Sequence, residues 1–355
     1  MEKNIRLKPA LDEQSKTLVA VQFQNGIGNF IMMTPAIKAL CEHYNAKVDV
    51  ILDKSWTDSR RIGLIEFCGL WDLVHSVREF QDGFDKDDYV QLYYAYHGES
   101  SESHTYFKEN AEFESDHVNW RAEKLHEINY YMNMVYKMGY RGEIPAQHYV
   151  KRNEPTFRQD ISDAAYFKIG LCNGFFAGSK WQWERKAWPY FAELTKLLRK
   201  YYRGKIKIFL FGKGKVEEEW AAKISEQPQV VNTVSKCSLP EAACCMQYMD
   251  LFITTDTGLM HVADAIGIPI LALFGATLIS KNGPYGKEHR ILRAPWSCVP
   301  CQMSPHFSTC DQWTCMEMLK PELVMAEVRS YICNLIKRGK IMTRKQGGEI
   351  KAAVL

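Results

Sequence analysis

The segment from Thr254 to His261 brings together threonine hydroxyls, a carboxylate, a glycine and a histidine. The apolar run Leu251–Ile253 predicts a buried strand before it, and the apolar spacing after it predicts a helix. Asp256 or Thr257 would cap this helix, whose free amides and positive dipole end suit a phosphate. The segment therefore predicts an anion site, and the competing interpretation is an ordinary helix cap with a core histidine.

Two neighbouring segments favour the anion site. The apolar run Pro269–Phe274 predicts the next strand, and two flexible loops follow it, Gly275–Thr277 and Asn282–Gly286. Ligands of open α/β sheets bind at such carboxyl ends of strands. Upstream, Lys186 places a cation just ahead of a helix predicted over Pro189–Arg199, with proline at its start.

The start of the chain has a similar layout. The run Thr17–Phe23 predicts a strand, Asn25–Asn29 a glycine turn, and the apolar residues after it a helix. A nicotinamide-binding turn would carry a third glycine where Ile31 stands, and no acidic residue completes a ribose site in this unit. The pattern thus argues against a nicotinamide-dependent oxidoreductase.

In this order, the segments resemble glycosyltransferase family 9, the heptosyltransferase-like enzymes. The resemblance is carried by residues 26–36, the Lys-x-Trp-Pro element at Lys186, residues 256–261, and residues 274–277 followed by Gly283-Pro284. It implies an α/β fold of the GT-B type, in which two Rossmann-like domains with parallel sheets face each other across a cleft. The donor sugar nucleotide would bind the second domain and the acceptor the first.

Length and composition agree with two domains, since 355 residues with 46% apolar content can fill two cores. We expect an acceptor-binding domain over 1–155, with a polar linker at 145–155, and a donor-binding domain over 156–337 that contains a cysteine-rich loop at 296–316. A basic tail follows over 338–355. The alternation of strands and helices after residue 166 predicts a parallel sheet with helices on both faces.

The first domain is predicted to contain strands at 47–52, 73–77 and 89–94 and a helix over 119–138. The polar stretch His97–Asp116 is predicted to be a loop. In the second domain, the predicted strands are 166–172, 205–211 and 230–231, and the predicted helices are 216–224 and 240–247.

The charge of the chain excludes some partners. A net charge of +3 is too small to predict binding to nucleic acid. No apolar run approaches the ~18 residues of a transmembrane segment. The polar start, Met1–Lys16, is unlike a signal peptide. We expect a cytoplasmic protein, with peripheral attachment to the inner leaflet if the acceptor is lipid-linked.

The resemblance assigns roles on the donor side. It implies that Lys186 holds the donor diphosphate, that the amides of Thr257 and Gly258 share this role, and that no catalytic metal is needed. The donor would be ADP-heptose, the reaction an inverting transfer, and the acceptor a lipopolysaccharide core, another glycan or a protein. The other residues implied in the donor pocket are Asp256, His261, Gly275 and Thr277, with Glu217 or Glu218 of the run 217–219 on the ribose.

The acceptor side, Gly26, Gly28 and Asn29, departs from the family pattern. An aspartate commonly stands at the position of Asn29 and deprotonates the acceptor hydroxyl, which an amide cannot do. Three interpretations follow: His97, Glu99 or Asp256 serves as the base; transfer passes through an oxocarbenium-like state with little base assistance; or the protein binds sugar nucleotides or glycans without catalysis.

Four of the eleven cysteines lie in one loop, with the spacing Cys298-x2-Cys301-x8-Cys310-x4-Cys315. This spacing is typical of a tetrahedral structural metal site, and zinc is the default metal for four thiolate ligands. Some heptosyltransferases of the family carry an iron-binding cysteine finger at a comparable place, so iron competes with zinc. Four reduced thiols without metal are the remaining alternative.

Overall fold

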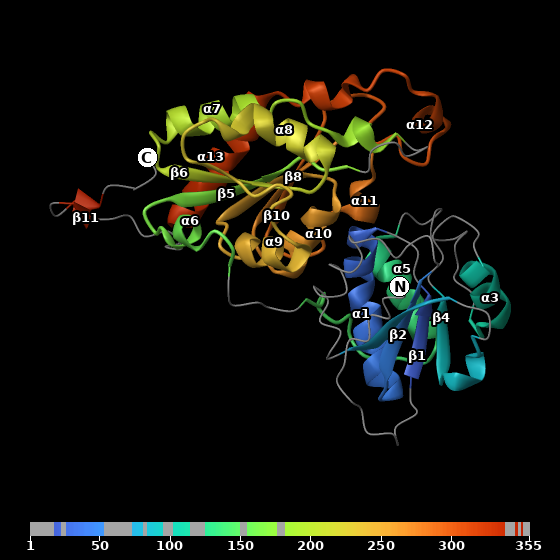
Figure 1. Ribbon diagram of the computed structural model, residues 1–355. Helices are drawn as coiled ribbons and strands as arrows, with labels where there is room; N and C mark the ends of the chain where they lie inside the picture. Colours follow the sequence, from blue (N-terminus) through green and yellow to red (C-terminus); the bar gives the residue numbers. More distant parts are fainter. Residues whose placement is uncertain are drawn as a thin grey trace. The chain divides into compact units, whose positions relative to one another are not determined.

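The computed structural model divides the chain into two compact units, Met1–Lys151 and Arg152–Leu355, so the division falls within the predicted linker. The structure describes residues 18–22, 26–52, 73–80, 84–94, 102–113, 125–149, 155–175 and 182–337, and the backbone of 345–346 and 349–350 (Figure 1). Among the described helices, none combines the length and apolarity that crossing a bilayer requires.

Unit 1 is a four-stranded parallel sheet in the order β3-β2-β1-β4, covered by helices. The strands are β1 (Leu18–Gln22), β2 (Lys47–Leu52), β3 (Val74–Glu79) and β4 (Gln91–Tyr94). The helices are α1 (Ile27–Tyr44), the 3-10 turn η2 (Lys86–Asp88), α3 (Glu102–Asn110) and α5 (Glu127–Lys137). Helices α1 and α5 pack against each other, while α3 packs on β1 and β4.

Helix α1 follows from a long apolar sequence that is buried along most of its length. It begins after Gly26 and ends at Asn45, which adopts a left-handed conformation at φ 49° and donates its N–H to the carbonyl of Cys41. Asparagine tolerates this conformation better than most residues, so it stops the helix cleanly. Asn29, the last residue of the predicted glycine turn, lies in the first turn of α1, so the helix begins inside the predicted turn.

Two predictions for unit 1 are wrong in part. The stretch 97–116 is not all loop, because α3 occupies its middle, with only Ser103, His104 and Phe107 buried among polar neighbours. Three buried positions are too few to show helical periodicity in the sequence. The helix predicted over 119–138 begins at Glu127, with the side chain of His126 capping it by accepting from the N–H of Ile128 at 3.2 Å; residues 119–124 lie outside the described residues.

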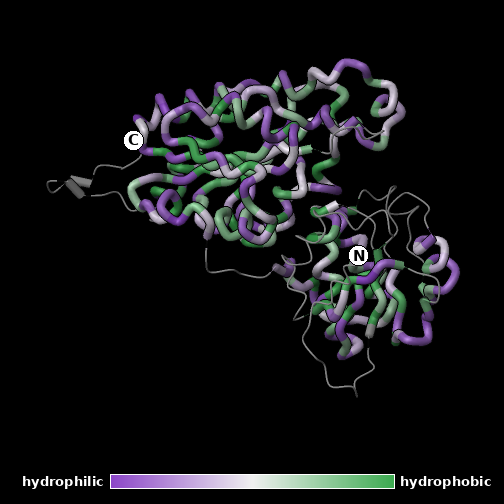
Figure 2. Tube along the Cα trace, in the orientation of Figure 1, coloured by the Kyte–Doolittle hydropathy of each residue, from purple (hydrophilic) through white to green (hydrophobic). Residues whose placement is uncertain are grey.

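Unit 2 is a six-stranded parallel sheet in the order β10-β9-β8-β5-β6-β7. The strands are β5 (Phe167–Cys172), β6 (Ile206–Phe211), β7 (Val230–Asn232), β8 (Leu251–Thr255), β9 (Ile270–Phe274) and β10 (His289–Arg293). A short antiparallel pair follows, β11 (Lys345–Gln346) and β12 (Glu349–Ile350). The central strands are almost entirely buried, and Figure 2 shows them as the most hydrophobic part of the unit.

Helices cover both faces of this sheet, as the alternating pattern predicts (Figure 1). The longer helices are α7 (Phe191–Tyr201), α8 (Lys215–Ser225), α9 (Leu239–Met246), α10 (Gly258–Ala265) and α13 (Pro321–Lys337). Helices α7 and α8 contact each other on one face with α13 beside α7, while α9 and α10 contact each other on the other. The short elements are α6 (Arg158–Ser162), η3 (Trp183–Lys186), α11 (Ile279–Asn282), α12 (Pro305–Thr309) and η4 (Thr314–Met318).

The strand order reverses between β5 and β8. From β5 the chain proceeds outward through β6 and β7, then returns to β8 on the other side of β5 and proceeds outward through β9 and β10. In open α/β sheets the connections leave in opposite directions at such a point, and the resulting crevice at the carboxyl ends of the strands binds ligands. The topology therefore directs attention to the residues that follow β5 and β8.

Candidate functional site

Thr257 caps the helix that follows β8. It adopts an extended conformation, and its hydroxyl accepts a hydrogen bond from the N–H of Leu259 at 3.0 Å. Of the two residues predicted to cap this helix, Thr257 is the cap, and Asp256 lies one residue before it. Its carboxylate is buried at the end of β8, and α10 begins at Gly258 with its amino end in the crevice region.

Lys186 reaches the same place from η3. Its ammonium lies 3.5 Å from Oδ2 of Asp256 and 4.8 Å from the centre of the Trp183 ring. The two charged side chains are 16% and 8% exposed, so water screens this pair weakly. A cation and the amino end of a helix therefore lie close together after β8.

The segment carrying Lys186 is fastened to the end of β5. Asn173 accepts from the backbone N–H of Trp188 at 2.9 Å and donates from its amide to the Trp188 carbonyl at 3.1 Å. The Trp188 ring is fully buried, and its indole N–H donates to the carbonyl of Leu319 at 2.7 Å. Because hydrogen bonds hold both the backbone of Trp188 and the far end of its side chain, the backbone just after Lys186 has a fixed position.

Arg185 anchors the other side of Lys186 to the cysteine-rich loop. Its buried guanidinium donates to the carbonyl of Phe307 at 2.6 Å and to the side-chain oxygen of Gln182 at 2.8 Å. It also lies 4.3 Å from the centre of the Phe307 ring and 5.5 Å from that of Trp313. No sequence pattern singled out this arginine, although its place beside Lys186 and the aromatic residues of the cysteine-rich loop indicate a cation–π contact.

The structure distinguishes Glu217 from its acidic neighbours. Glu217 is half-buried and folds over Gly174 and Gly212, whereas Glu218 and Glu219 are exposed. A Cβ on Gly212 would lie 2.8 Å from the Glu217 Cβ, and one on Gly174 would lie 3.3 Å from its carboxylate Oε1. Glycine at both positions lets this carboxylate lie beside the carboxyl ends of β5 and β6. Glu218, predicted as the alternative to Glu217, is exposed, as expected for a residue on a solvated helix face.

The loop after β9 packs against the cysteine-rich loop. A Cβ on Gly275 would lie 2.6 Å from Sδ of Met316, so only glycine fits without displacement. The carbonyl of Ala276 accepts from the N–H groups of Cys301 and Gln302 at 3.1 and 2.8 Å. Thr277 is buried, and its hydroxyl has no hydrogen-bond partner among the described residues. A buried hydroxyl in this state is suited to bind a ligand.

Helix α10 also fixes the glycine loop that follows α11. The buried carboxylate of Asp264 accepts from the N–H groups of Tyr285 and Gly286 at 2.8 and 2.9 Å. His261, one turn before Asp264, is 3% exposed. It lies on a buried face of α10, the position that the core-histidine interpretation expects.

The four loop cysteines are not gathered into a coordination site. Within the described ranges, which include all four, no group of three or more His, Cys, Asp or Glu side chains is close enough to hold a metal ion. Cys301 packs with Ala276 and Phe307, Cys315 belongs to the main core of the unit, and the Cys310 thiol donates to the carbonyl of Gln312 at 3.4 Å.

The thiols nevertheless influence one another. Burial raises the pKa of the Cys301 thiol, and the neighbouring charges of Cys298, Cys315 and Cys310 raise it further, while the Arg185 guanidinium lowers it. Burial likewise raises the pKa of Cys315, with Cys298 and Cys310 contributing in the same direction. The loop therefore brings four soft donors and one buried cation into one neighbourhood.

In unit 1, the structure reveals a residue that the sequence analysis missed. The side-chain amide of Asn29 donates to the carboxylate of Glu127, which is fully buried at the start of α5. Gly26 precedes α1 as its capping residue, and Gly28 is buried in its first turn. Of the candidate bases, His97 and Glu99 lie outside the described residues, and Asp256 belongs to unit 2.

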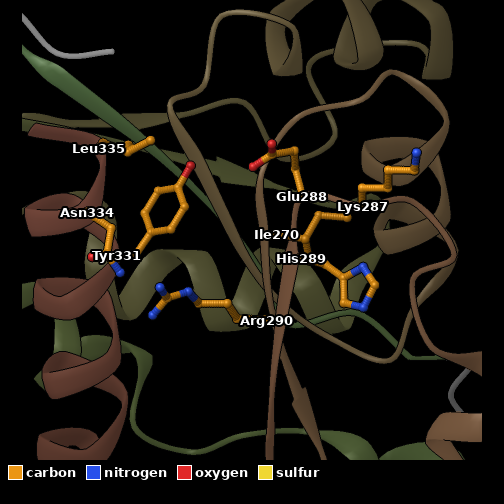
Figure 3. A pocket seen from close by; sticks show the side chains of 8 residues that line it. All are labelled: Ile270, Lys287, Glu288, His289, Arg290, Tyr331, Asn334 and Leu335. Carbon is orange, nitrogen blue, oxygen red and sulfur yellow. The ribbon is translucent and has the colours of Figure 1, made fainter. Parts of the chain in front are cut away.

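A separate cavity of about 340 Å³ opens where β9 and β10 begin. Figure 3 shows Tyr331 of α13 and Arg290 of β10 among the side chains that line it. Its lining residues are Ile270, Lys287, Glu288, His289, Arg290, Tyr331, Asn334 and Leu335. Because the strands are parallel, this cavity lies at the opposite edge of the sheet from Asp256 and Lys186.

The two parallel α/β units, one of which has a cation and a capped helix at its topological switch point, have the architecture of the GT-B type. A sequence model of glycosyltransferase family 9 (heptosyltransferase) matches residues 120–310, more than half of the chain, and the chain belongs to this family. Lipooligosaccharide heptosyltransferase 2 of Campylobacter jejuni is 28% identical over 169 residues, 45% of this chain and 50% of the relative. The chain thus spans about half the length of such curated relatives.

Solved structures agree on the fold. A family 9 glycosyl transferase from Veillonella parvula matches with a TM-score of 0.66 at 18% identity, covering 90% of this chain and 98% of that one. The iron-containing heptosyltransferase TibC from enterotoxigenic Escherichia coli, in complex with ADP-D-β-D-heptose, matches with a TM-score of 0.58 at 11% identity, covering 90% and 77%. At these identities the structures establish the GT-B fold alone.

Proposed function

We propose that this protein is an inverting glycosyltransferase that moves a heptose from ADP-heptose to an acceptor hydroxyl, foremost on a lipopolysaccharide inner core. The observation that carries the proposal is the pairing of Lys186 with Asp256 directly before the capped amino end of α10, at the switch point of the unit 2 sheet. Family membership and the similarity to lipooligosaccharide heptosyltransferase 2 support the choice of sugar and acceptor.

The site suits the departure of a nucleoside diphosphate. In the transfer, the acceptor oxygen bonds to the anomeric carbon while the bond from that carbon to the diphosphate oxygen breaks. The leaving diphosphate gains negative charge, which Lys186 and the first-turn amides of α10 would stabilise. Glu217, at the carboxyl ends of β5 and β6, would accept from the ribose hydroxyls, and the Thr277 hydroxyl would bind the donor.

The test is ADP release. Purified protein with ADP-heptose and heptose-deficient lipopolysaccharide should release ADP in proportion to heptose transferred. A sugar-nucleotide-binding protein without catalysis would instead raise its melting temperature with ADP-heptose and release no ADP with any acceptor. The use of a nucleotide sugar also favours a cytoplasmic location, with the inner leaflet as the place of a lipid-linked acceptor.

The cysteine-rich loop would bind a structural zinc or iron ion. Four thiols within one loop, with the buried Arg185 guanidinium to offset the charge of thiolates, form a soft donor set that suits either metal. The iron-containing neighbour TibC supports iron. Metal binding would draw the four thiols together and, through Arg185 and Phe307, hold the segment that carries Lys186. No step of the transfer is assigned to this ion.

A further inference from the structure

Asn29 and Glu127 form a hydrogen-bonded pair at the position where many family members carry an aspartate. Asn29 lies in the first turn of α1 and is half-buried, while Glu127 is the first residue of α5 and is 0% exposed. The side-chain amide nitrogen Nδ2 of Asn29 donates to Oε2 of Glu127 across the packed helices. Tyr131, one turn along α5, also hydrogen-bonds the Asn29 side chain.

The pairing dictates which way the carboxamide points. An ionised carboxylate only accepts hydrogen bonds, so the NH2 group of Asn29 must face Glu127 and the carbonyl oxygen must face away from it. Burial raises the pKa of Tyr131, but its hydrogen bond with Asn29 lowers it, so the Asn29 amide donates this bond as well. The carbonyl oxygen of Asn29 is thus left to accept from an outside donor. A buried carboxylate needs such a donor to offset its desolvation, which makes this orientation costly to reverse.

We propose that Glu127 is a positioning residue of the acceptor site: it fixes Asn29 so that its carbonyl oxygen accepts the hydrogen bond of the attacking hydroxyl. This deepens the proposed function and rests on it. Asn29 keeps both amide protons throughout. The hydroxyl oxygen bonds to the anomeric carbon as the diphosphate leaves, and the hydroxyl proton passes to solvent water once that bond is forming. Orientation of the nucleophile, rather than proton removal, is the contribution of the pair.

The first test is Glu127→Gln. A carboxamide can present either its oxygen or its NH2 group, so it no longer forces the Asn29 carbonyl outward. We expect kcat for ADP release from ADP-heptose, with heptose-deficient lipopolysaccharide as acceptor, to fall about tenfold, and KM for ADP-heptose to stay unchanged. Glu42→Gln is the matched control: this exposed carboxylate of α1 accepts from the Tyr140 hydroxyl at 3.2 Å and should tolerate the change.

The second test exchanges the two groups. In Asn29→Asp two carboxylates face each other, so one of them has a raised pKa in the folded state. The folded state therefore tolerates this pair at low pH, where one carboxyl is protonated, and loses stability as the pH rises and both ionise. Relative to wild type, the melting temperature should therefore drop more at pH 8 than at pH 5. Adding Glu127→Gln restores the hydrogen bond, with the amide at position 127 now donating to the carboxylate at position 29. The double variant should therefore lose the extra drop in melting temperature at pH 8 and reach at least wild-type kcat.

The outcomes separate the two proposals. Wild-type kcat in Glu127→Gln, or an Asn29→Asp melt that matches wild type from pH 5 to pH 8, overturns the role of Glu127 while leaving the transferase assignment intact. Wild-type protein that releases no ADP overturns both. If Glu127→Gln fails to fold, recovery of fold and kcat in the double variant still supports the pair, and its failure to recover them overturns it.

Discussion

Replacing Lys186 by alanine removes the cation that we assign to the donor diphosphate. Its ammonium lies 3.5 Å from Asp256, and the side chain is 16% exposed, so the charge acts in a weakly screened setting. Removing it also leaves the buried Asp256 carboxylate without this partner, so we expect some loss of stability in addition to the loss of rate.

The size of the rate effect follows from charge and distance. Two unit charges about 4 Å apart at an effective dielectric of ~20 interact by about 4 kcal/mol. Asp256 already attracts the ammonium before the reaction, so the differential gain in the transition state is smaller. Removal of one such stabilising group costs about 2.7 to 4 kcal/mol, which corresponds to a fall in kcat of about 10²- to 10³-fold.

Lys207 offers a matched control in the same unit. Its ammonium lies 3.2 Å from Oδ1 of Asp160 and 5.0 Å from the centre of the Tyr166 ring, and its side chain is 13% exposed. It stands near the start of β6, at the edge of the sheet opposite the candidate site. Lys207→Ala should therefore leave kcat unchanged and lower stability less than Lys186→Ala, because Asp160 is 42% exposed whereas Asp256 is 8% exposed.

The assay is ADP release at saturating ADP-heptose, with melting curves of both variants. Wild-type turnover in Lys186→Ala would refute the assignment of Lys186 to the diphosphate. An equal fall in kcat in Lys207→Ala would show that the loss reflects general destabilisation.

Three further changes test the loops around the site. Cys301→Ser should abolish about one equivalent of bound zinc or iron and lower the melting temperature, whereas Cys333→Ser should retain the metal; metal analysis showing none in reduced wild-type protein would contradict this. Thr277→Val should keep or raise the free energy of unfolding while weakening ADP-heptose binding up to about tenfold by calorimetry; a destabilised variant would mean that the hydroxyl has a structural partner. Gly275→Ala should lower the free energy of unfolding by about 1 to 3 kcal/mol in denaturant, because its Cβ would meet Met316; wild-type stability would show that Met316 yields freely.

The sequence predicted many elements of unit 2 to within a few residues, but it gave no prediction for β10 or α13. Strands such as Leu251–Thr255 are short apolar runs, and helices such as α9 carry a complete capping box at Ser238 and Glu241. These signals are local, since periodicity and capping depend on residues a few positions apart. The same locality let the sequence place Lys186 and Asp256 at the ends of their elements.

Prediction from the sequence failed where a pattern was short or where several neighbouring residues fitted the same role. Helix α3 was missed because only three of its residues are buried. The run 217–219 could not be resolved into one site residue, because which glutamate faces Gly174 and Gly212 depends on how α8 packs against the sheet. The sequence also gave no sign that contact with Asp256 and Trp183 leaves the Lys186 side chain largely buried.

What the sequence by itself determined is the class of fold, the family, and the identity of the residues at the strand ends. Only the tertiary structure decided which of them meet. Asn29 and Glu127 are 98 positions apart, and no local rule links them. Helices α1 and α5 bring them together because each buries an apolar face against the other. Contacts of this kind depend on the packing of whole elements, which the spacing of residues along the chain does not specify.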